Sequence, residues 1–254
     1  MIGSLNYMAG VGCPVVSDSM AGNGIRLSRD IMGTTVNLAA SDGHQFSAYL
    51  AAPAESPRGG IVIGMEMYGV NDYLKSVCDK YAAAGFCAIA PALFDRAEND
   101  LVLPYDADGM RRGKEISHAV NYDQVLDDVT TAAARIASAG KVAISGYCFG
   151  GTITWLAACR CEFDAAIAYY GSNMCDFPEE TAQCPIISHV GSLDTAVPPE
   201  DVAMFKERCP EVGWFIYDGI RHGFDSHVRP ERYDSDASAL AWQRTQAFMA
   251  EHIG

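Results

Sequence analysis

The sequence predicts an α/β protein, a three-layer α/β/α sandwich around a mostly parallel, doubly wound sheet. From about residue 60 to the end, short runs that are apolar on both faces alternate with longer amphipathic segments, as buried parallel strands alternate with helices. Two short segments before them, residues 34–39 and 45–51, flank an Asp-Gly pair and predict an antiparallel hairpin. The length of 254 residues suits one domain of this kind.

Each later element is predicted by a local signal. The first buried strand is expected at residues 60–65, which read GIVIGM. Asn71 or Asp72 can cap the next helix, because both side chains accept hydrogen bonds from free backbone N–H groups. After a polar stretch at about 94–113, apolar residues recur every three or four positions over 117–138 and predict one helix. The remaining elements are strands at 86–90, 142–144, 165–169, 185–190 and 213–217, and helices from about 151, at 200–208 and at 235–252.

The composition excludes several classes of protein. A net charge of −14 argues against nucleic acid as a partner, because binding phosphates requires clustered Lys and Arg. For the same reason, an anionic small molecule would need a local positive site in order to bind. No run approaches the ~18 apolar residues of a membrane helix, and the first residues lack the basic start of a secretory signal. We therefore expect a soluble protein with neither a membrane nor a nucleic-acid partner.

Nine cysteines without paired spacing indicate reduced thiols in a cytoplasmic protein. Cys159 and Cys161 are too close together for a zinc pair of the CxxC kind, so no structural metal is expected. We expect an N-terminal extension at residues 1–33, a single domain at 34–254, no cofactor, and a monomer or small homo-oligomer.

The segment KVAISGYCFGGTITW, residues 141–155, places Cys148 between a strand-like run and a helix-like run. Gly146 and Gly150 flank it, as in a nucleophile elbow, whose tight turn tolerates only very small neighbours. The N-terminus of a helix also favours a thiolate over a thiol. The alternative is a buried core cysteine beside a tight turn. The catalytic interpretation therefore depends on partners later in the chain.

Two later segments supply an acid and a base. Asp194 follows the buried run 185–190, and His222 lies in a Gly-flanked loop after the run 213–217. The order Cys148, Asp194, His222 is that of nucleophile, acid and histidine in α/β hydrolases, and all three follow strand ends at one edge of the predicted sheet. Taken singly, Asp194 would be a turn former and His222 a surface residue. Together the three predict a catalytic triad.

Glu66 directly follows the first buried strand. Burying a carboxylate there costs free energy unless the group is paired. One interpretation is an ordinary salt bridge or an exposed acid at a strand end. The other is that Glu66 controls the protonation of the Cys148 thiol. The backbone amides of Met67 and Phe149 are candidates for an oxyanion hole, the second because it follows the nucleophile.

These segments together resemble the dienelactone hydrolase family, whose members are cysteine-dependent enzymes of the α/β-hydrolase fold. The likeness spans about residue 34 to the end, and its motifs are EMYGV, PALFDR, GYCFGG, YYG, GSLDTAVP and RHGF. The resemblance implies that Cys148 attacks the carbonyl of an unsaturated lactone. It further implies that His222 and Asp194 complete the triad, and that Glu66 takes the thiol proton when substrate binds.

The resemblance also implies substrate-binding residues. Arg96 in PALFDR matches the family arginine that holds the substrate carboxylate, and arginine suits bidentate contacts of this kind; an exposed loop arginine is the alternative. Tyr170 in YYG is expected to contact the substrate. Ser226 stands where the family has a second carboxylate-binding arginine, four residues after the histidine. Arg229 can replace that arginine if the loop folds back.

We therefore expect a hydrolase that opens a lactone or cleaves a small carboxylic ester, with or without a carboxylate group, through a thioacyl-enzyme intermediate. One alternative, favoured by Ser226, is a general carboxylesterase or thioesterase without dienelactone preference. The other alternative is a non-catalytic redox-sensing or binding protein on the same fold, in which Cys148 reacts with oxidants.

Overall fold

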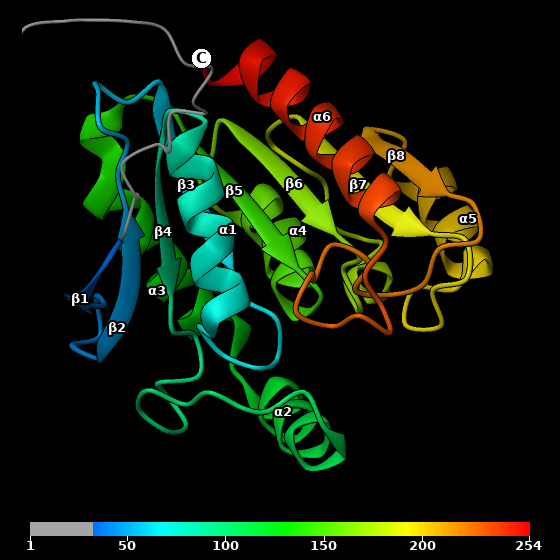
Figure 1. The fold of residues 1–254 in the computed structure, drawn as a ribbon, viewed down its shortest axis with the longest axis horizontal. Helices are drawn as coiled ribbons and strands as arrows, with labels where there is room; N and C mark the ends of the chain where they lie inside the picture. Colours follow the sequence, from blue (N-terminus) through cyan, green and yellow to red (C-terminus); the bar gives the residue numbers. More distant parts are fainter. Residues whose placement is uncertain (1–32) are drawn as a thin grey trace, which may run out of the picture. The chain divides into compact units, whose positions relative to one another are not determined.

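The computed structural model describes residues 33–254, so that the expected N-terminal extension, except for Gly33, lies outside the described residues. Eight strands form one mixed sheet (Figure 1). They are β1 (Thr34–Ala39), β2 (Gln45–Ala51), β3 (Gly59–Gly64), β4 (Phe86–Pro91), β5 (Val142–Tyr147), β6 (Ala165–Tyr169), β7 (Ile186–Gly191) and β8 (Val212–Tyr217). Their order across the sheet is β1-β2-β4-β3-β5-β6-β7-β8.

The strand pairing confirms the expected mostly parallel sheet with an N-terminal hairpin. β1 runs antiparallel to β2, and β2 runs antiparallel to β4. All further neighbours, from β4 and β3 to β8, are parallel. The hairpin turn contains Gly43 at φ 85°, a conformation that glycine adopts without steric cost.

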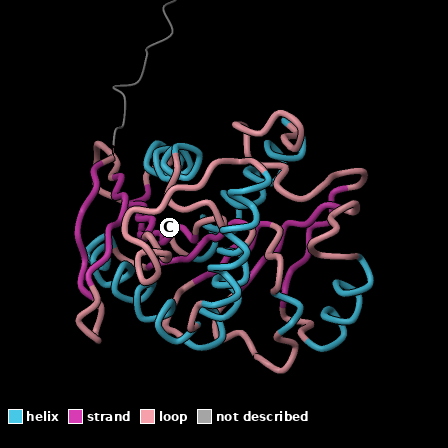
Figure 2. Tube along the Cα trace, turned by 90° about the horizontal axis from the view of Figure 1, so that it is seen from below, coloured by secondary structure: helices cyan, strands magenta, loops and turns pink. Residues whose placement is uncertain are grey.

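Six α-helices accompany the sheet: α1 (Asp72–Ala83), α2 (Ala107–Ala119), α3 (Tyr122–Ile136), α4 (Phe149–Arg160), α5 (Pro199–Arg208) and α6 (Ser235–His252). In Figure 1, α1 and α6 cover one face of the sheet, and α3, α4 and α5 cover the other. Figure 2 shows the strands between these helix layers. α2 belongs to neither layer and lies at the edge of the sheet where the parallel strands end (Figure 1). No helix of the described residues is long and apolar enough to cross a membrane.

The middle of the sheet forms the core that supports this edge. Every residue of β3 and β6 is buried, and α4 is buried along almost its whole length. Such strands are apolar on both faces because helices cover both sides. The expected cap of α1 is confirmed, since Oδ1 of Asn71 accepts a hydrogen bond from the N–H of Leu74 at 3.0 Å.

One expected helix is wrong in its extent. Residues 94–113 were expected as a polar stretch and 117–138 as a single helix, but α2 already begins at Ala107 and α3 begins at Tyr122. Asn121 separates the two helices, because its side-chain oxygen caps α3 by accepting the N–H of Asp123 at 2.9 Å. The first half of α2 contains two glycines. Glycine has a low helix propensity, so this part of the helix is hard to predict from the sequence. The site described below depends on this helix.

Candidate active site

Cys148 occupies the turn between β5 and α4, at the edge where the parallel strands end. Its backbone angles, φ 56° and ψ −114°, lie in a region that few residues with a side chain adopt. Two hydrogen bonds fix the turn. The N–H of Cys148 donates to the carbonyl of Tyr169 at 3.0 Å, and the N–H of Gly151 donates to the carbonyl of Cys148 at 2.9 Å. The turn therefore has the geometry of a nucleophile elbow.

The glycines around Cys148 are required by close backbone packing. A Cβ at Gly146 would lie 1.9 Å from the carbonyl oxygen of Gly150, and a Cβ at Gly150 would lie 2.2 Å from that of Gly64. Both distances are far below van der Waals contact, so β3, β5 and the start of α4 can approach only without side chains at these positions. Glycine is thus required at both positions for steric reasons.

Asp194 and His222 meet in the loops after β7 and β8. Nδ1 of His222 lies 2.8 Å from Oδ2 of Asp194. The other carboxylate oxygen accepts the N–H groups of Ala196 at 2.8 Å and Val197 at 3.1 Å. Asp194 is buried, so its carboxylate is held by three donors. A carboxylate fixed in this way orients the imidazole and leaves Nε2 for proton transfer.

His222 and Cys148 line the same cavity. Burial lowers the pKa of His222, but the charge of the Cys148 sulfur and the hydrogen bond to Asp194 outweigh burial and raise the pKa to about 10. A histidine with this pKa is an imidazolium at neutral pH. The arrangement therefore places a histidine that can donate a proton in the same cavity as the sulfur of Cys148.

Glu66 follows β3 and is only 2% exposed. Its Oε2 accepts a hydrogen bond from the hydroxyl of Tyr105 at 2.8 Å, and the Tyr105 oxygen in turn accepts one from Nδ2 of Asn71 at 2.9 Å. Burial raises the pKa of Glu66, whereas the Tyr105 hydrogen bond and the charge of Arg229 act in the opposite direction. The carboxyl group consequently takes up a proton more readily than an exposed glutamate.

Arg229, the candidate replacement for the second family arginine, lies on the wall of the same cavity. Its guanidinium group lies over the rings of Tyr105, at 4.9 Å from the centroid, and of Tyr68, at 5.6 Å. Nε is 3.4 Å from a carboxylate oxygen of Glu231. The cation is thus held against two aromatic faces beside Glu66, an arrangement that contributes cation–π attraction.

The cavity has a volume of about 360 Å³, within the size range of small-molecule sites. Met67 and Phe149 both line it. Within residues 33–254, the backbone N–H of neither residue donates to a protein acceptor, so both amides are available to a substrate oxygen. In the same part of the chain, no cluster of three or more His, Cys, Asp or Glu side chains is placed to hold a metal ion.

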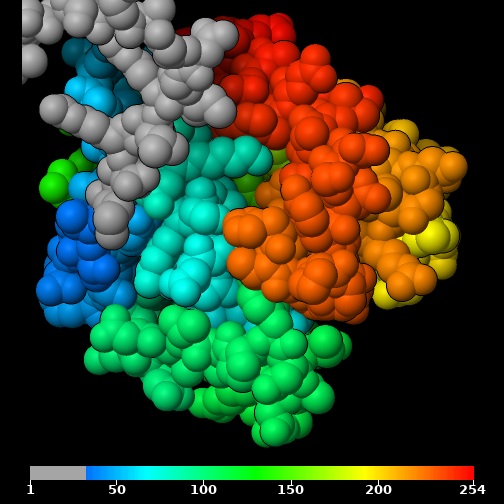
Figure 3. All heavy atoms as spheres, viewed as in Figure 1, coloured from blue at the N-terminus to red at the C-terminus, as the bar shows by residue number. Residues whose placement is uncertain are grey.

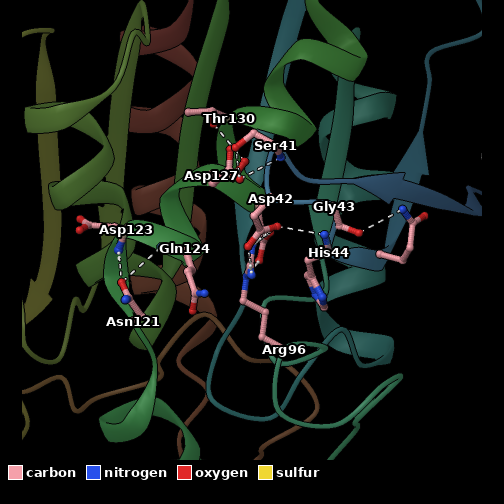
Figure 4. A network of polar contacts seen from close by, with 12 residues as sticks. Ser41, Asp42, Gly43, His44, Arg96, Asn121, Asp123, Gln124, Asp127 and Thr130 are labelled. Atoms are coloured by element: carbon pink, nitrogen blue, oxygen red, sulfur yellow. Dashed lines mark hydrogen bonds and ion pairs between the residues drawn. The ribbon is translucent and has the colours of Figure 1, made fainter.

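Arg96, expected to bind the substrate, does not line this cavity. Its Nη2 lies 2.7 Å from Oδ1 of Asp128. Its Nη1 lies 2.7 Å from Oδ2 of Asp42 in the hairpin turn, and Figure 4 shows Arg96 beside Asp42. Asp128 is almost fully buried, so withdrawing Arg96 would leave an unpaired buried carboxylate. In this arrangement Arg96 ties the β1–β2 turn to α3.

Ser226 and Tyr170 also lie behind the cavity wall. Both side chains are fully buried, and neither lines the cavity. The ring of Tyr170 packs edge-on against His222, with 4.9 Å between the ring centroids, and its hydroxyl lies 3.4 Å from that of Tyr73. Tyr170 thus supports the position of the histidine ring.

The structure adds residues to the site that were not found from the sequence. Tyr105 holds Glu66, and Lys114 and His118 of α2 line the cavity together with Arg232. Tyr105 falls in the expected polar stretch and Lys114 directly follows it, whereas His118 falls at the start of the helix expected over 117–138. The available signal was Asp106, which caps α2 by accepting the N–H of Gly109 at 2.8 Å.

Comparisons with known proteins agree with this architecture. The model of the dienelactone hydrolase family matches residues 46–253. Carboxymethylenebutenolidases of Pseudomonas putida and Pseudomonas knackmussii are each 29% identical over 230 residues, which cover 85% of this chain and 95% of theirs. A Klebsiella pneumoniae crystal structure described as a "Putative Dienelactone Hydrolase" matches with a TM-score of 0.75 at 26% identity, covering 87% of this chain and 99% of that chain. The chain has the α/β-hydrolase fold and belongs to the dienelactone hydrolase family.

Proposed function

We propose that this member of the family hydrolyses lactones or small carboxylic esters with Cys148 as the nucleophile. The observation that carries the proposal is the thiol in a strained elbow, sharing one cavity with a histidine that is hydrogen-bonded to a buried aspartate. The relatives named carboxymethylenebutenolidase support a lactone as substrate class.

In the first half-reaction, the Cys148 thiolate attacks the carbonyl carbon and forms a C–S bond. The carbonyl oxygen becomes an oxyanion, which the amides of Met67 and Phe149 stabilise. When the intermediate collapses, the bond to the ester oxygen breaks, and His222 gives its proton to that oxygen. In a lactone the alcohol formed in this way remains attached to the acyl group.

In the second half-reaction, water attacks the thioester. His222, now neutral, takes a proton from the water, and Asp194 stabilises the imidazolium that results. The C–S bond breaks, the carboxylic acid leaves, and the thiolate–imidazolium pair is restored. The atoms and protons of the cycle balance with water as the only co-reactant.

Glu66 is proposed to take the proton of the resting Cys148 thiol when substrate binds and to return it to the sulfur after the product leaves. This proton is separate from the one that His222 gives to the leaving group and regains from water. Burial raises the pKa of Glu66, so its carboxyl group accepts a proton more readily than an exposed glutamate does. The Tyr105 hydroxyl keeps the carboxyl group in place before and after that transfer.

The test is hydrolysis of 4-nitrophenyl acetate by the wild type and by Cys148→Ala, with Cys87→Ala on β4 as the matched control. We expect loss of turnover only in Cys148→Ala. His222→Gln should accumulate an acetyl thioester on Cys148, detected by mass spectrometry of the quenched enzyme, because removal of the base slows attack by water. Equal turnover in wild type and Cys148→Ala would exclude this nucleophile.

A general carboxylesterase or thioesterase is the second candidate. It is favoured by Arg96, which is engaged with Asp42 and Asp128, and by Ser226, which brings no charge. Comparing kcat/KM for a dienelactone, an aryl ester and an acyl thioester separates the two. A redox sensor predicts oxidation of Cys148 without turnover of any of these esters. The eight cysteines of the described part of the chain are free thiols, which supports the proposed reducing, cytoplasmic setting.

A further inference from the structure

Asp225 is a buried carboxylate that the proposed reaction does not use. It lies three residues after His222, in the loop between β8 and α6, and is only 5% exposed. It does not line the catalytic cavity, and within residues 33–254 no basic side chain lies within ion-pair distance of it. Burial raises the pKa of Asp225, and the charges of Lys80 and His227 offset this effect only in part. A carboxylate in such a place is costly unless hydrogen bonds hold it.

Two hydrogen bonds of Asp225 fasten the loop that carries His222 to two helices. Its Oδ2 accepts a hydrogen bond from the hydroxyl of Tyr73 on α1 at 2.9 Å, and its Oδ1 accepts one from the hydroxyl of Ser238 on α6 at 2.5 Å. Figure 3 shows the surface of α1, in cyan, meeting that of the loop between β8 and α6, in orange. Hydrogen bonds to a charged acceptor are the stronger ones in proteins, so the carboxylate fixes the loop between α1 and α6.

The same carboxylate is connected to His222 by a second route, through two tyrosines. Tyr73 donates its hydroxyl proton to Asp225, so its oxygen is the acceptor in the contact with the Tyr170 hydroxyl, at 3.4 Å. The ring of Tyr170 packs edge-on against His222, with 4.9 Å between the ring centroids. Both tyrosines are buried, and water does not compete for these contacts. A continuous chain thus runs from the carboxylate to the imidazole.

Tyr170 requires such a constraint, because its backbone lies in the left-handed region at φ 42°. A residue with a side chain persists in this conformation only where its surroundings enforce it. The N–H of Tyr170 donates to the carbonyl of His189 at 2.8 Å, which fixes the backbone. The contact with Tyr73 fixes the other end of the side chain. The ring that packs on His222 is therefore held at both ends.

We propose that Asp225 is a positioning residue for the catalytic histidine. It acts through Tyr73 and Tyr170, which hold the His222 ring so that Nδ1 stays 2.8 Å from the Asp194 carboxylate. The role rests on the proposed function only in that His222 is the base of the reaction. Misplacing a catalytic group by about 1 Å can cost about a hundredfold in rate, so the loss of Asp225 should appear in kcat rather than in KM.

The direct test compares two variants that each remove one buried tyrosine hydroxyl. Tyr73→Phe breaks the link to Asp225, whereas Tyr169→Phe removes a hydroxyl that lies 2.8 Å from Oγ1 of Thr245 instead. We expect kcat for 4-nitrophenyl acetate to fall about ten- to hundredfold in Tyr73→Phe, with KM within about twofold of wild type. Tyr169→Phe should keep the wild-type kcat. Both variants should lose a similar amount of melting temperature, so the difference in kcat reports position rather than stability.

Asp225→Asn tests the acid itself. An amide offers one acceptor oxygen where the carboxylate offers two, so either Tyr73 or Ser238 loses its acceptor, and we expect the same fall in kcat. Because the two changes break one chain, the double variant Tyr73→Phe/Asp225→Asn should be about as slow as the slower single variant. A kcat in both single variants equal to that of Tyr169→Phe overturns the positioning role.

A second readout does not require hydrolysis. The proton between Nδ1 of His222 and the Asp194 carboxylate is followed by proton NMR. In Tyr73→Phe and Asp225→Asn its signal should shift and exchange faster with water, whereas Tyr169→Phe should leave it unchanged. If the signal responds in this way but the wild type hydrolyses no ester, the proposed function fails and the positioning role stands. If the wild type hydrolyses esters and neither kcat nor the signal changes in the two variants, the positioning role fails alone.

Discussion

The hydroxyl of Tyr105 donates a hydrogen bond of 2.8 Å to Oε2 of Glu66. Tyr105 lies just before α2, whereas Glu66 follows β3, so the loop ahead of α2 controls the environment of the buried carboxyl group. Asn71, which caps α1, holds the tyrosine oxygen from the other side. Three segments of the chain thus determine how the Glu66 carboxyl group is placed at the end of β3.

Tyr105→Phe removes this hydrogen bond without removing the ring. Because the bond lowers the pKa of Glu66, its loss moves that pKa upward, and the limb of the pH–rate profile that reports Glu66 should move to higher pH. We also expect a loss of stability of about 1–2 kcal/mol, since a buried acceptor loses its donor. Ester hydrolysis across pH and urea unfolding measure the two effects. Tyr49→Phe, which removes a remote hydroxyl bonded to Asp79, is the control, and an identical pH profile in Tyr105→Phe would contradict the assignment.

The raised pKa of His222 should depend on the sulfur of Cys148. In the wild type, the imidazolium should persist up to a pH of about 10, so the acylation rate should fall only above that pH, when no proton remains for the leaving group. Cys148→Ala removes the negative partner, and the pKa of His222 should drop. NMR titration of the histidine ring measures it, with Cys87→Ala as control. A His222 pKa that is the same in wild type and Cys148→Ala argues against a thiolate–imidazolium pair.

Asp194→Asn should lower kcat strongly and change the stability of the fold only a little. The amide oxygen can still accept the N–H groups of Ala196 and Val197, but the side chain no longer fixes the tautomer of His222. We expect kcat to fall by about a thousandfold or more, the scale seen when an aspartate of this role is replaced. Steady-state kinetics and thermal unfolding should be measured together. A large fall in melting temperature with kcat nearly intact would indicate a structural role only.

Gly146→Ala should disrupt the elbow. The added methyl group would meet backbone atoms of Gly150 at 1.9 and 2.3 Å, and backbone cannot move aside as a side chain can. We expect a loss of about 2–4 kcal/mol in the free energy of unfolding, as in severe overpacking, together with loss of hydrolysis. Gly213→Ala is the matched control in β8, because there the nearest atom is a side-chain carbon of Ile187 at 3.2 Å. Urea unfolding that is equal in the two variants would refute the steric argument.

Arg96→Gln distinguishes a structural arginine from a substrate-binding one. Its removal leaves the buried Asp128 without its cation, and we expect a loss of about 3 kcal/mol in stability. KM for a carboxylate-bearing ester should change little, because Arg96 does not line the catalytic cavity. Arg111→Gln, which breaks an exposed pair with Glu115, controls for loss of charge. A large rise in KM with stability unchanged would restore the substrate-binding role.

Much of the fold could be predicted because its signals are local. The apolar runs of β3 to β8 and the capping residue Asn71 each act within a few positions of the chain. The extent of α2 and α3 could not be predicted in this way. α2 carries Gly113, and a Cβ added there would lie 2.4 Å from the carbonyl oxygen of Met67. A residue unfavourable for a helix is therefore present because the helix packs closely on the loop after β3. Tertiary packing overrode propensity there.

The sequence by itself determined which residues meet at the centre of the candidate site. GYCFGG fixes an elbow through its glycines, and Asp194 and His222 follow strand ends that parallel pairing brings to one edge of the sheet. Only the tertiary structure decided which charged side chains surround this centre. Arg96 pairs with Asp42 and Asp128, and Lys114 faces the cavity. The physical reason is that the direction of a long charged side chain depends on ion-pair partners that are remote in the sequence. The conformation of a strained turn, by contrast, depends on the residues within the turn.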